Sequence, residues 1–170
     1  MSHHERLSHE DTVFLDVESP RNDMNVGVCL VFEAGPWTQA GGGLDFERLA
    51  TYIESRLDEN HRYRQRLAAT PIENRPLWVD DEDFEIRNHL RRLRLPEPGR
   101  MVELQTLCAE IVPQQLSRTR PLWEFWLIEG LESGELALLA KAHHCMVDGV
   151  AGMQLLMSLL DTEPRDDFDP

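Results

Sequence analysis

The sequence predicts a single domain of the α/β or α+β layered class. Segments with the composition of strands alternate along the chain with segments of helical periodicity, which is the order found in such layered domains. Hydrophobic residues make up 41% of the 170 residues, which is enough to form a core, and no internal repeat is evident. This composition excludes a disordered chain.

The first predicted elements are a short helix and a strand. Ser8 is a plausible N-cap, with Asp11 three residues later in a capping-box pattern, so a helix is expected within Leu7 to Ser19. The segment Met24 to Glu33 is rich in Val, Leu and Phe. It predicts a strand that is buried on both faces.

The middle of the chain is predicted to contain a loop, a helix and two extended segments. The loop is the glycine-rich stretch from Gly35 to Gly43. Asp45 is then expected to cap a helix that runs from Phe46 to about Asn60. Leu77 to Val79 is expected to be extended, and Phe84 to Leu95 is interpreted as an edge strand.

The last third is predicted to begin with a helix and continue with a hairpin. The helix is expected over Met101 to Leu116 and should bend or break at Pro113. The segments Leu122 to Glu129 and Glu135 to Cys145 are predicted to pair as strands through a turn at Gly130 to Gly134.

The acidic composition narrows the possible partners. The net charge is −14, and Lys141 is the only lysine. This argues against nucleic acid as a partner and against simple electrostatic adhesion to anionic lipid. Two groups of arginines are expected to be solvated beside acidic neighbours rather than to bind phosphate or membrane. They are Arg56, Arg62, Arg64 and Arg66, and Arg87, Arg91, Arg92 and Arg94.

The cysteines and the apolar runs predict a cytoplasmic protein. Cys29, Cys108 and Cys145 are far apart without a CxxC spacing, so they are expected to be reduced, buried thiols. The longest apolar run, Leu136 to Ala140, is far shorter than the roughly 18 residues that a membrane-spanning helix needs. We therefore expect a soluble or peripheral protein.

Two adjacent histidines at the end of an apolar strand are the strongest candidates for a chemical site. Successive side chains of a strand point to opposite faces, so His143 and His144 are not expected to face one cavity unless the strand bends there. His144 shares its face with the small Ala140 and Ala142, which leave room for a substrate. We therefore expect His144 to be chemical and His143 to be structural.

Histidine suits base catalysis near neutral pH. Its ordinary pKa of about 6.5 lets the neutral imidazole take a proton from an alcohol or a thiol. No serine or cysteine stands at a nucleophile elbow, which favours direct base catalysis by His144. Asp148, followed by Gly149, is expected to cap a last helix over Val150 to Leu160 and to orient the loop without transferring protons.

Two other interpretations of the histidine pair stay open from the residues alone. Such a pair can be surface polarity or core filling. Two histidines and an aspartate are also legitimate metal ligands. Adjacent histidines on opposite strand faces chelate poorly, however, and His61 and His89 offer no helical i, i+4 partner, so no metal ion is expected.

The string from His143 to Gly149 matches HHxxxDG, the signature of the CoA-dependent acyltransferase superfamily. That superfamily resembles chloramphenicol acetyltransferase in fold and includes the condensation domains of peptide synthetases. The flanking sequence resembles the N-terminal half of a bacterial wax ester synthase/diacylglycerol acyltransferase. The stretches that carry this resemblance are Leu7 to Ser19, Met24 to Glu33, Pro76 to Leu90, Leu95 to Gly99 and Arg120 to Leu131.

The resemblance implies a fold and a reaction. The fold is the N-terminal subdomain of a chloramphenicol-acetyltransferase-like CoA-dependent acyltransferase, a mixed sheet with packed helices, over residues 1–160. Residues 161–170 are interpreted as the start of an acidic, proline-containing linker. The reaction implied is transfer of a fatty acyl group from acyl-CoA, as co-substrate, to diacylglycerol or a long-chain alcohol, with no cofactor. Peripheral contact with a membrane or lipid droplet is a further expectation.

The family pattern also assigns roles to residues. By match to the motif, His144 is the general base that deprotonates the acceptor hydroxyl. The residues expected to hold the geometry of the site are His143, Asp148 and Gly149. The residues of the Pro-Leu-Trp element, expected to be structural rather than to touch substrate, are Pro121, Leu122 and Trp123.

The length of the chain departs from the family, whose members are more than twice as long and have two subdomains. The second subdomain is expected to be absent, so the isolated chain is predicted to have little or no turnover. A condensation-type acyltransferase of the same superfamily is one alternative. A non-catalytic remnant that binds a partner is another.

Overall fold

A computed structural model describes residues 5–57, 60–70 and 76–147 and contains two sheets. The larger sheet has the strand order β2-β7-β6-β5, in which β7 is antiparallel to both neighbours and β5 is parallel to β6. Its strands are β2 (Asn25–Phe32), β5 (Leu90–Arg94), β6 (Trp123–Glu129) and β7 (Leu136–His143). The smaller antiparallel sheet has the order β1-β4-β3, from β1 (Glu5–Arg6), β3 (Gln65–Ala68) and β4 (Leu77–Asp80).

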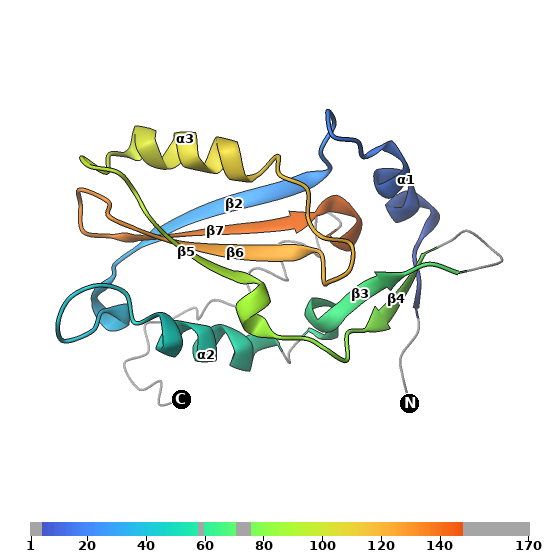
Figure 1. Ribbon diagram of the computed structural model, residues 1–170, viewed down its shortest axis with the longest axis horizontal. Coiled ribbons are helices and arrows are strands. Elements are labelled where there is room, and N and C mark those ends of the chain that lie inside the picture. The colour runs from blue at the N-terminus through green and yellow to red at the C-terminus, as the bar shows by residue number, and fades with distance from the viewer. Residues whose placement is uncertain (1–4, 58–59, 71–75, 148–170) are drawn as a thin grey trace.

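Three α-helices surround the larger sheet in the described part of the chain. They are α1 (His9–Val17), α2 (Phe46–Leu57) and α3 (Met101–Ile111). Figure 1 shows α3 on one side of the sheet, α2 on the other, and α1 beside the end of β7. The predicted class, a mixed sheet with helices packed on it, is confirmed.

The strand β7 is buried because helices cover both faces of the sheet at its centre. Leu136 and Leu138 belong to the larger core cluster, together with buried residues of α2 and the smaller sheet. Ala137 and Leu139 belong to a second cluster that includes residues of α3. A strand that contributes side chains to two cores is apolar on both faces, which explains the continuous apolar run from Leu136 to Ala140. The predicted hairpin of β6 and β7 is confirmed.

The prediction that Met24 to Glu33 is buried on both faces is wrong. The strand β2 lies at the edge of the larger sheet, and Val26, Val28 and Val31 are 38%, 41% and 37% exposed. A run of apolar residues predicts a strand but not its position in the sheet, since the position depends on pairing with β7, more than a hundred residues later.

The predicted caps of the first two helices are confirmed. Ser8 Oγ accepts a hydrogen bond of 3.0 Å from the Asp11 N–H at the start of α1. Asp45 Oδ1 accepts one of 3.2 Å from the Arg48 N–H at the start of α2. Both helices therefore begin where side-chain oxygens satisfy free backbone donors.

The other predicted boundaries need correction in places. The edge position of the fifth strand is confirmed, but only Leu90–Arg94 is extended, because a 3-10 helix, η3 (Ile86–Asn88), precedes it. The helix α3 ends at Ile111, two residues before Pro113, because proline has no backbone N–H to continue the helical hydrogen bonds. The strands β1 and β3 were not predicted. The helix expected over residues 150–160 and the linker over 161–170 lie outside the described residues.

The only lysine of the chain joins β7 to the end of α3. Lys141 is 1% exposed, and its Nζ donates hydrogen bonds to the carbonyl oxygens of Ile111, at 3.0 Å, and of Gln114. Asn25 of β2 donates to the Gln114 oxygen as well, at 2.9 Å. Free carbonyls at a helix C-terminus attract a cation, so these contacts hold α3 on the sheet.

Candidate active site

The two adjacent histidines lie at the point where β7 ends. His143 is the last residue of the strand and stands opposite Asn25 in β2. His144 is the first residue of a 3-10 turn, η4 (His144–Met146), and its N–H donates to the Met24 oxygen at 2.7 Å. The strand thus stops two residues earlier than predicted. The direction of the His144 ring is consequently set by this turn and not by strand alternation.

The ring of His144 rests on an aromatic side chain of α1. It is half-buried and stacks on Phe14, with the ring centroids 4.0 Å apart and the planes at 20°. Its Nδ1 is buried and has no hydrogen-bond partner among the described residues. Stacking fixes the plane of an imidazole but occupies neither nitrogen. The ring is therefore held in place by Phe14, while no described residue forms a hydrogen bond with its Nδ1.

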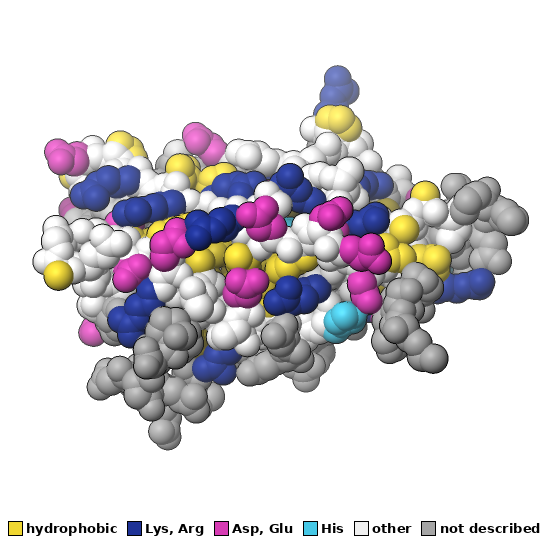
Figure 2. All heavy atoms as spheres, turned by 60° about the horizontal axis from the view of Figure 1, so that its bottom comes forward, with side chains coloured by type: hydrophobic (Ala, Val, Ile, Leu, Met, Phe, Trp, Pro, Cys, Tyr) yellow, Lys and Arg dark blue, Asp and Glu magenta, His cyan; other side chains and the backbone are white. Residues whose placement is uncertain are grey.

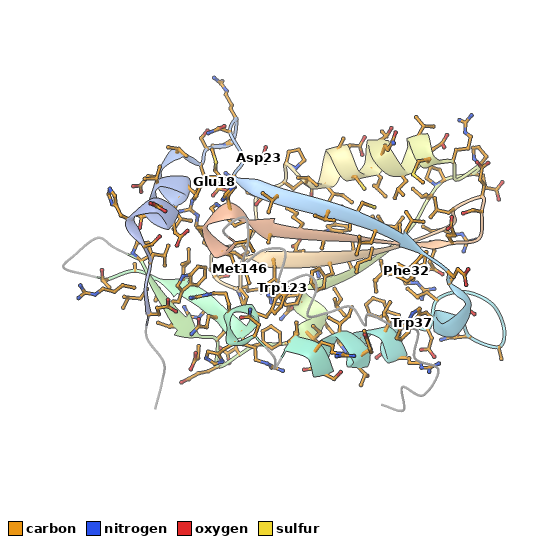
Figure 3. The ribbon with its side chains drawn as sticks, turned by 180° about the vertical axis from the view of Figure 1, so that it is seen from behind. Glu18, Asp23, Phe32, Trp37, Trp123 and Met146 are labelled. Carbon is orange, nitrogen blue, oxygen red and sulfur yellow. The ribbon has the colours of Figure 1, made fainter. Side chains whose placement is uncertain are left out.

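The ring of His143 has different surroundings. It is 1% exposed, and its Nδ1 accepts a hydrogen bond of 3.1 Å from the Cys145 N–H. Its Nε2 lies 3.3 Å from Glu18 Oε1, which is an ion-pair distance, but the two atoms form no hydrogen bond. Figure 3 shows Glu18 and Met146, which ends η4, at the same end of the sheet, close to α1.

Two residues near the histidines were not predicted as site residues, although both lie in Leu7 to Ser19, a stretch that carries the family resemblance. Phe14 and Glu18 stand four positions apart on α1 and its C-terminal cap, a spacing that places side chains on one helix face. That spacing and the resemblance of this stretch were the available signals. Asp148 and Gly149, which were expected to shape the site, lie outside the described residues.

The Pro-Leu-Trp element is buried in the larger core. Leu122 and Trp123 are each 1% exposed, and Pro121 is buried as well. The Trp123 Nε1 donates to the Tyr63 oxygen at 2.9 Å, and its ring stacks on His89 with centroids 4.4 Å apart. This burial is what a packing role requires.

The arginine groups lie beside carboxylates, as expected from the sequence. Figure 2 shows basic and acidic side chains interspersed over one face of the protein. Arg92 Nε is 2.6 Å from Glu129 Oε2, and Arg87 forms an ion pair with Glu47. Other pairs are Arg62 with Glu5, Arg64 with Glu54, Arg66 with Asp81 and Arg91 with Glu124.

The cysteines are free, but the prediction that all three are buried is wrong. Cys145 is buried, whereas Cys29 is exposed on the edge strand β2 and Cys108 is half-buried on α3. In the ranges that the structure describes, no group of three or more His, Cys, Asp or Glu is placed to hold a metal ion. No helix of those ranges is long and apolar enough to cross a membrane.

The two buried histidines make stability depend on pH. Burial lowers the pKa of His143, with the Arg118 charge and His144 acting in the same direction and Glu18 opposing them. Burial also lowers the pKa of His89. Since the folded pKa lies below the unfolded value of about 6.5 for each ring, the unfolded chain binds protons first as the pH falls.

We therefore expect the free energy of unfolding to be largest above about pH 6.5 and to decrease below it. Each ring contributes a slope of at most about 1.4 kcal/mol per pH unit. Urea unfolding between roughly pH 7.5 and 5.5 measures this slope, in a range where ordinary carboxylates are still ionised. A stability that stays constant or increases as the pH falls would contradict it.

The fold of this chain is shared with a solved condensation domain. The starter condensation domain of rhizomide synthetase RzmA superposes with a TM-score of 0.68, over 92% of this chain and 36% of that one, at 15% identity. At this identity the similarity concerns the fold alone.

The chain belongs to the wax ester synthase/diacylglycerol acyltransferase family, whose catalytic-domain model matches residues 7–170. The wax ester synthase/diacylglycerol acyltransferase from Marinobacter aquaeolei VT8 is 33% identical, with a TM-score of 0.73 over 88% of this chain and 36% of that chain. A Mycobacterium tuberculosis protein named as a diacylglycerol O-acyltransferase is 42% identical over 162 residues, which are 94% of this chain and 32% of that protein. This chain thus spans about a third of the length of these relatives.

Proposed function

We propose that this chain supplies the histidine-bearing part of an acyltransferase that transfers a fatty acyl group from acyl-CoA to an alcohol. The acceptor is the hydroxyl of a diacylglycerol or of a long-chain alcohol. Membership of the family supports this reaction. The observation that carries it in the structure is the position of His144 directly after β7, where its ring stacks on Phe14 and no described residue forms a hydrogen bond with its Nδ1.

His144 acts as the general base in this proposal. Its imidazole takes the proton of the acceptor hydroxyl, and the oxygen attacks the thioester carbonyl of acyl-CoA. The carbon–sulfur bond then breaks, an ester is formed, and the CoA thiolate takes the proton back from the imidazolium. The neutral ring is regenerated, so one proton moves from the alcohol to CoA in each turnover.

His143 and Asp148 hold the geometry of the site in this scheme, and the Pro-Leu-Trp element supports the fold beneath it. The isolated 170-residue chain should have little or no turnover, because its match covers only 32% of the Mycobacterium tuberculosis relative. Substrate positioning and stabilisation of the tetrahedral oxyanion contribute much of the rate of acyl transfer. We propose that the remaining part of such a relative supplies them.

Measurement of CoA release from palmitoyl-CoA tests the proposal. It is made on the chain alone and on an extended protein, in which this chain replaces the matching third of the Mycobacterium tuberculosis relative. The extended protein is expected to use hexadecanol or a diacylglycerol, and the chain alone is expected to use neither. Transfer to an aminoacyl thioester but not to alcohols would favour a condensation-type enzyme. Robust turnover by the chain alone would contradict the incomplete site.

A further inference from the structure

The buried carboxylate of Glu18 lies between an imidazole and a guanidinium. Glu18 is the C-terminal cap of α1, and its side chain is 5% exposed. Its Oε2 accepts a hydrogen bond of 2.7 Å from Arg118 Nη2, and its Oε1 lies 3.3 Å from His143 Nε2. Burial of a carboxylate is costly unless it is paired. The Arg118 hydrogen bond and the nearby His143 ring are the partners found for Glu18 among the described residues.

The Cys145 backbone determines where the His143 proton lies. The Cys145 N–H donates to His143 Nδ1, so this nitrogen carries no proton. A neutral ring then carries its proton on Nε2, the atom that faces Glu18. Neither Glu18 Oε1 nor His143 Nε2 has a hydrogen-bond partner among the described residues. A donor and an acceptor that are otherwise unmatched therefore stand opposite each other.

The same contacts hold the turn that carries His144. Cys145 is the middle residue of η4, and its N–H is bound by the His143 ring, which caps the turn. Phe14, on the helix that Glu18 ends, stacks on His144. One helix therefore contacts both histidines, the first through a carboxylate and the second through an aromatic ring.

We propose that Glu18 and Arg118 are positioning residues for the acyl transfer. Glu18 holds His143 as the Nε2–H tautomer, and His143 holds the turn of His144 through the Cys145 N–H. Arg118 binds the second carboxylate oxygen and so fixes the orientation of the first. This inference rests on the proposed function, because His144 needs positioning only if it reacts.

The arrangement requires a group with two acceptor oxygens. Arg118 and His143 both present donors to Glu18. A glutamine in its place has one oxygen and would leave one donor facing an NH₂ group. Glu18→Gln is therefore not a conservative change at this site. Removal of the Arg118 donor should restore the contact with His143, because the single amide oxygen of the glutamine can then turn to the His143 ring.

Nitrogen NMR of the 170-residue chain tests this without any turnover. At roughly pH 7.5 the wild-type His143 ring is expected as the Nε2–H tautomer. In the Glu18→Gln variant, the His143 ring should lose this tautomer. Hydrogen exchange of the Cys145 amide should be about ten-fold faster, as expected when one hydrogen bond is lost. The double variant Glu18→Gln/Arg118→Leu should regain both. The matched control is Asp16→Ala, an exposed acidic residue of the same helix, which should change neither.

Two results would overturn the inference. The first is an Nδ1–H tautomer of His143 in the wild-type chain. This measurement needs no variant, so it decides the question even if Glu18→Gln fails to fold. The second is an unchanged tautomer and amide exchange in a folded Glu18→Gln chain. In the extended protein, Glu18→Gln should lower kcat about ten-fold and leave KM within about two-fold. The proposed function itself is decided separately by the His144→Ala variant, so the two failures are distinguishable.

Discussion

The His144→Ala variant of the extended protein is expected to have a kcat about 10²- to 10⁴-fold below that of the unsubstituted protein. The imidazole is the group that takes the hydroxyl proton in the proposed mechanism, and alanine cannot replace it. The ring is half-buried at the surface of η4 and stacks on a single aromatic side chain, so its loss should leave the fold intact. Steady-state rates with palmitoyl-CoA and hexadecanol measure the effect.

The control for this variant is His61→Ala. His61 is an exposed histidine of the 3-10 helix η2 (His61–Arg64), and its Nε2 lies 2.7 Å from Asp80 Oδ1. Its replacement removes an imidazole of the same size and should leave kcat within about two-fold. A His144→Ala protein that retained the full rate of ester formation would exclude the general-base role.

The Trp123→Ala variant is expected to lose about 3–5 kcal/mol of the free energy of unfolding. Trp123 is 1% exposed, stacks on His89 and donates its indole N–H to the Tyr63 oxygen. Alanine leaves a cavity in the larger core and an unpaired carbonyl. Because a domain has only about 5–15 kcal/mol of net stability, this single change threatens the fold. Urea unfolding followed by circular dichroism measures it.

Trp126→Ala is the matched control, because Trp126 lies on the same strand, β6, but is only half-buried. Its indole N–H donates to Glu124 in a longer contact of 3.2 Å. The loss of stability should therefore be smaller than for Trp123→Ala. If Trp123→Ala instead kept its full stability and lost only activity in the extended protein, the Pro-Leu-Trp element would contact substrate and not support the fold.

Features that depend on neighbours in the sequence could be predicted from the sequence alone. The caps at Ser8 and Asp45 involve donors three residues later, and the β6–β7 hairpin is closed by a short turn. The end of α3 before Pro113 follows from the missing N–H of proline. In each case the physical cause lies within a few neighbouring residues, so the local sequence pattern is sufficient to predict the feature.

The surroundings of the two histidines were decided by the tertiary structure. The sequence placed His143 and His144 at the end of a strand, and this is where they lie. It could not show that Glu18 and Arg118, a hundred positions apart, meet beside His143. It also could not show that β2 lies at the sheet edge, since strand order depends on which segments pair. Such contacts arise from the packing of α1 against the end of β7, and no local pattern encodes a distance across the fold.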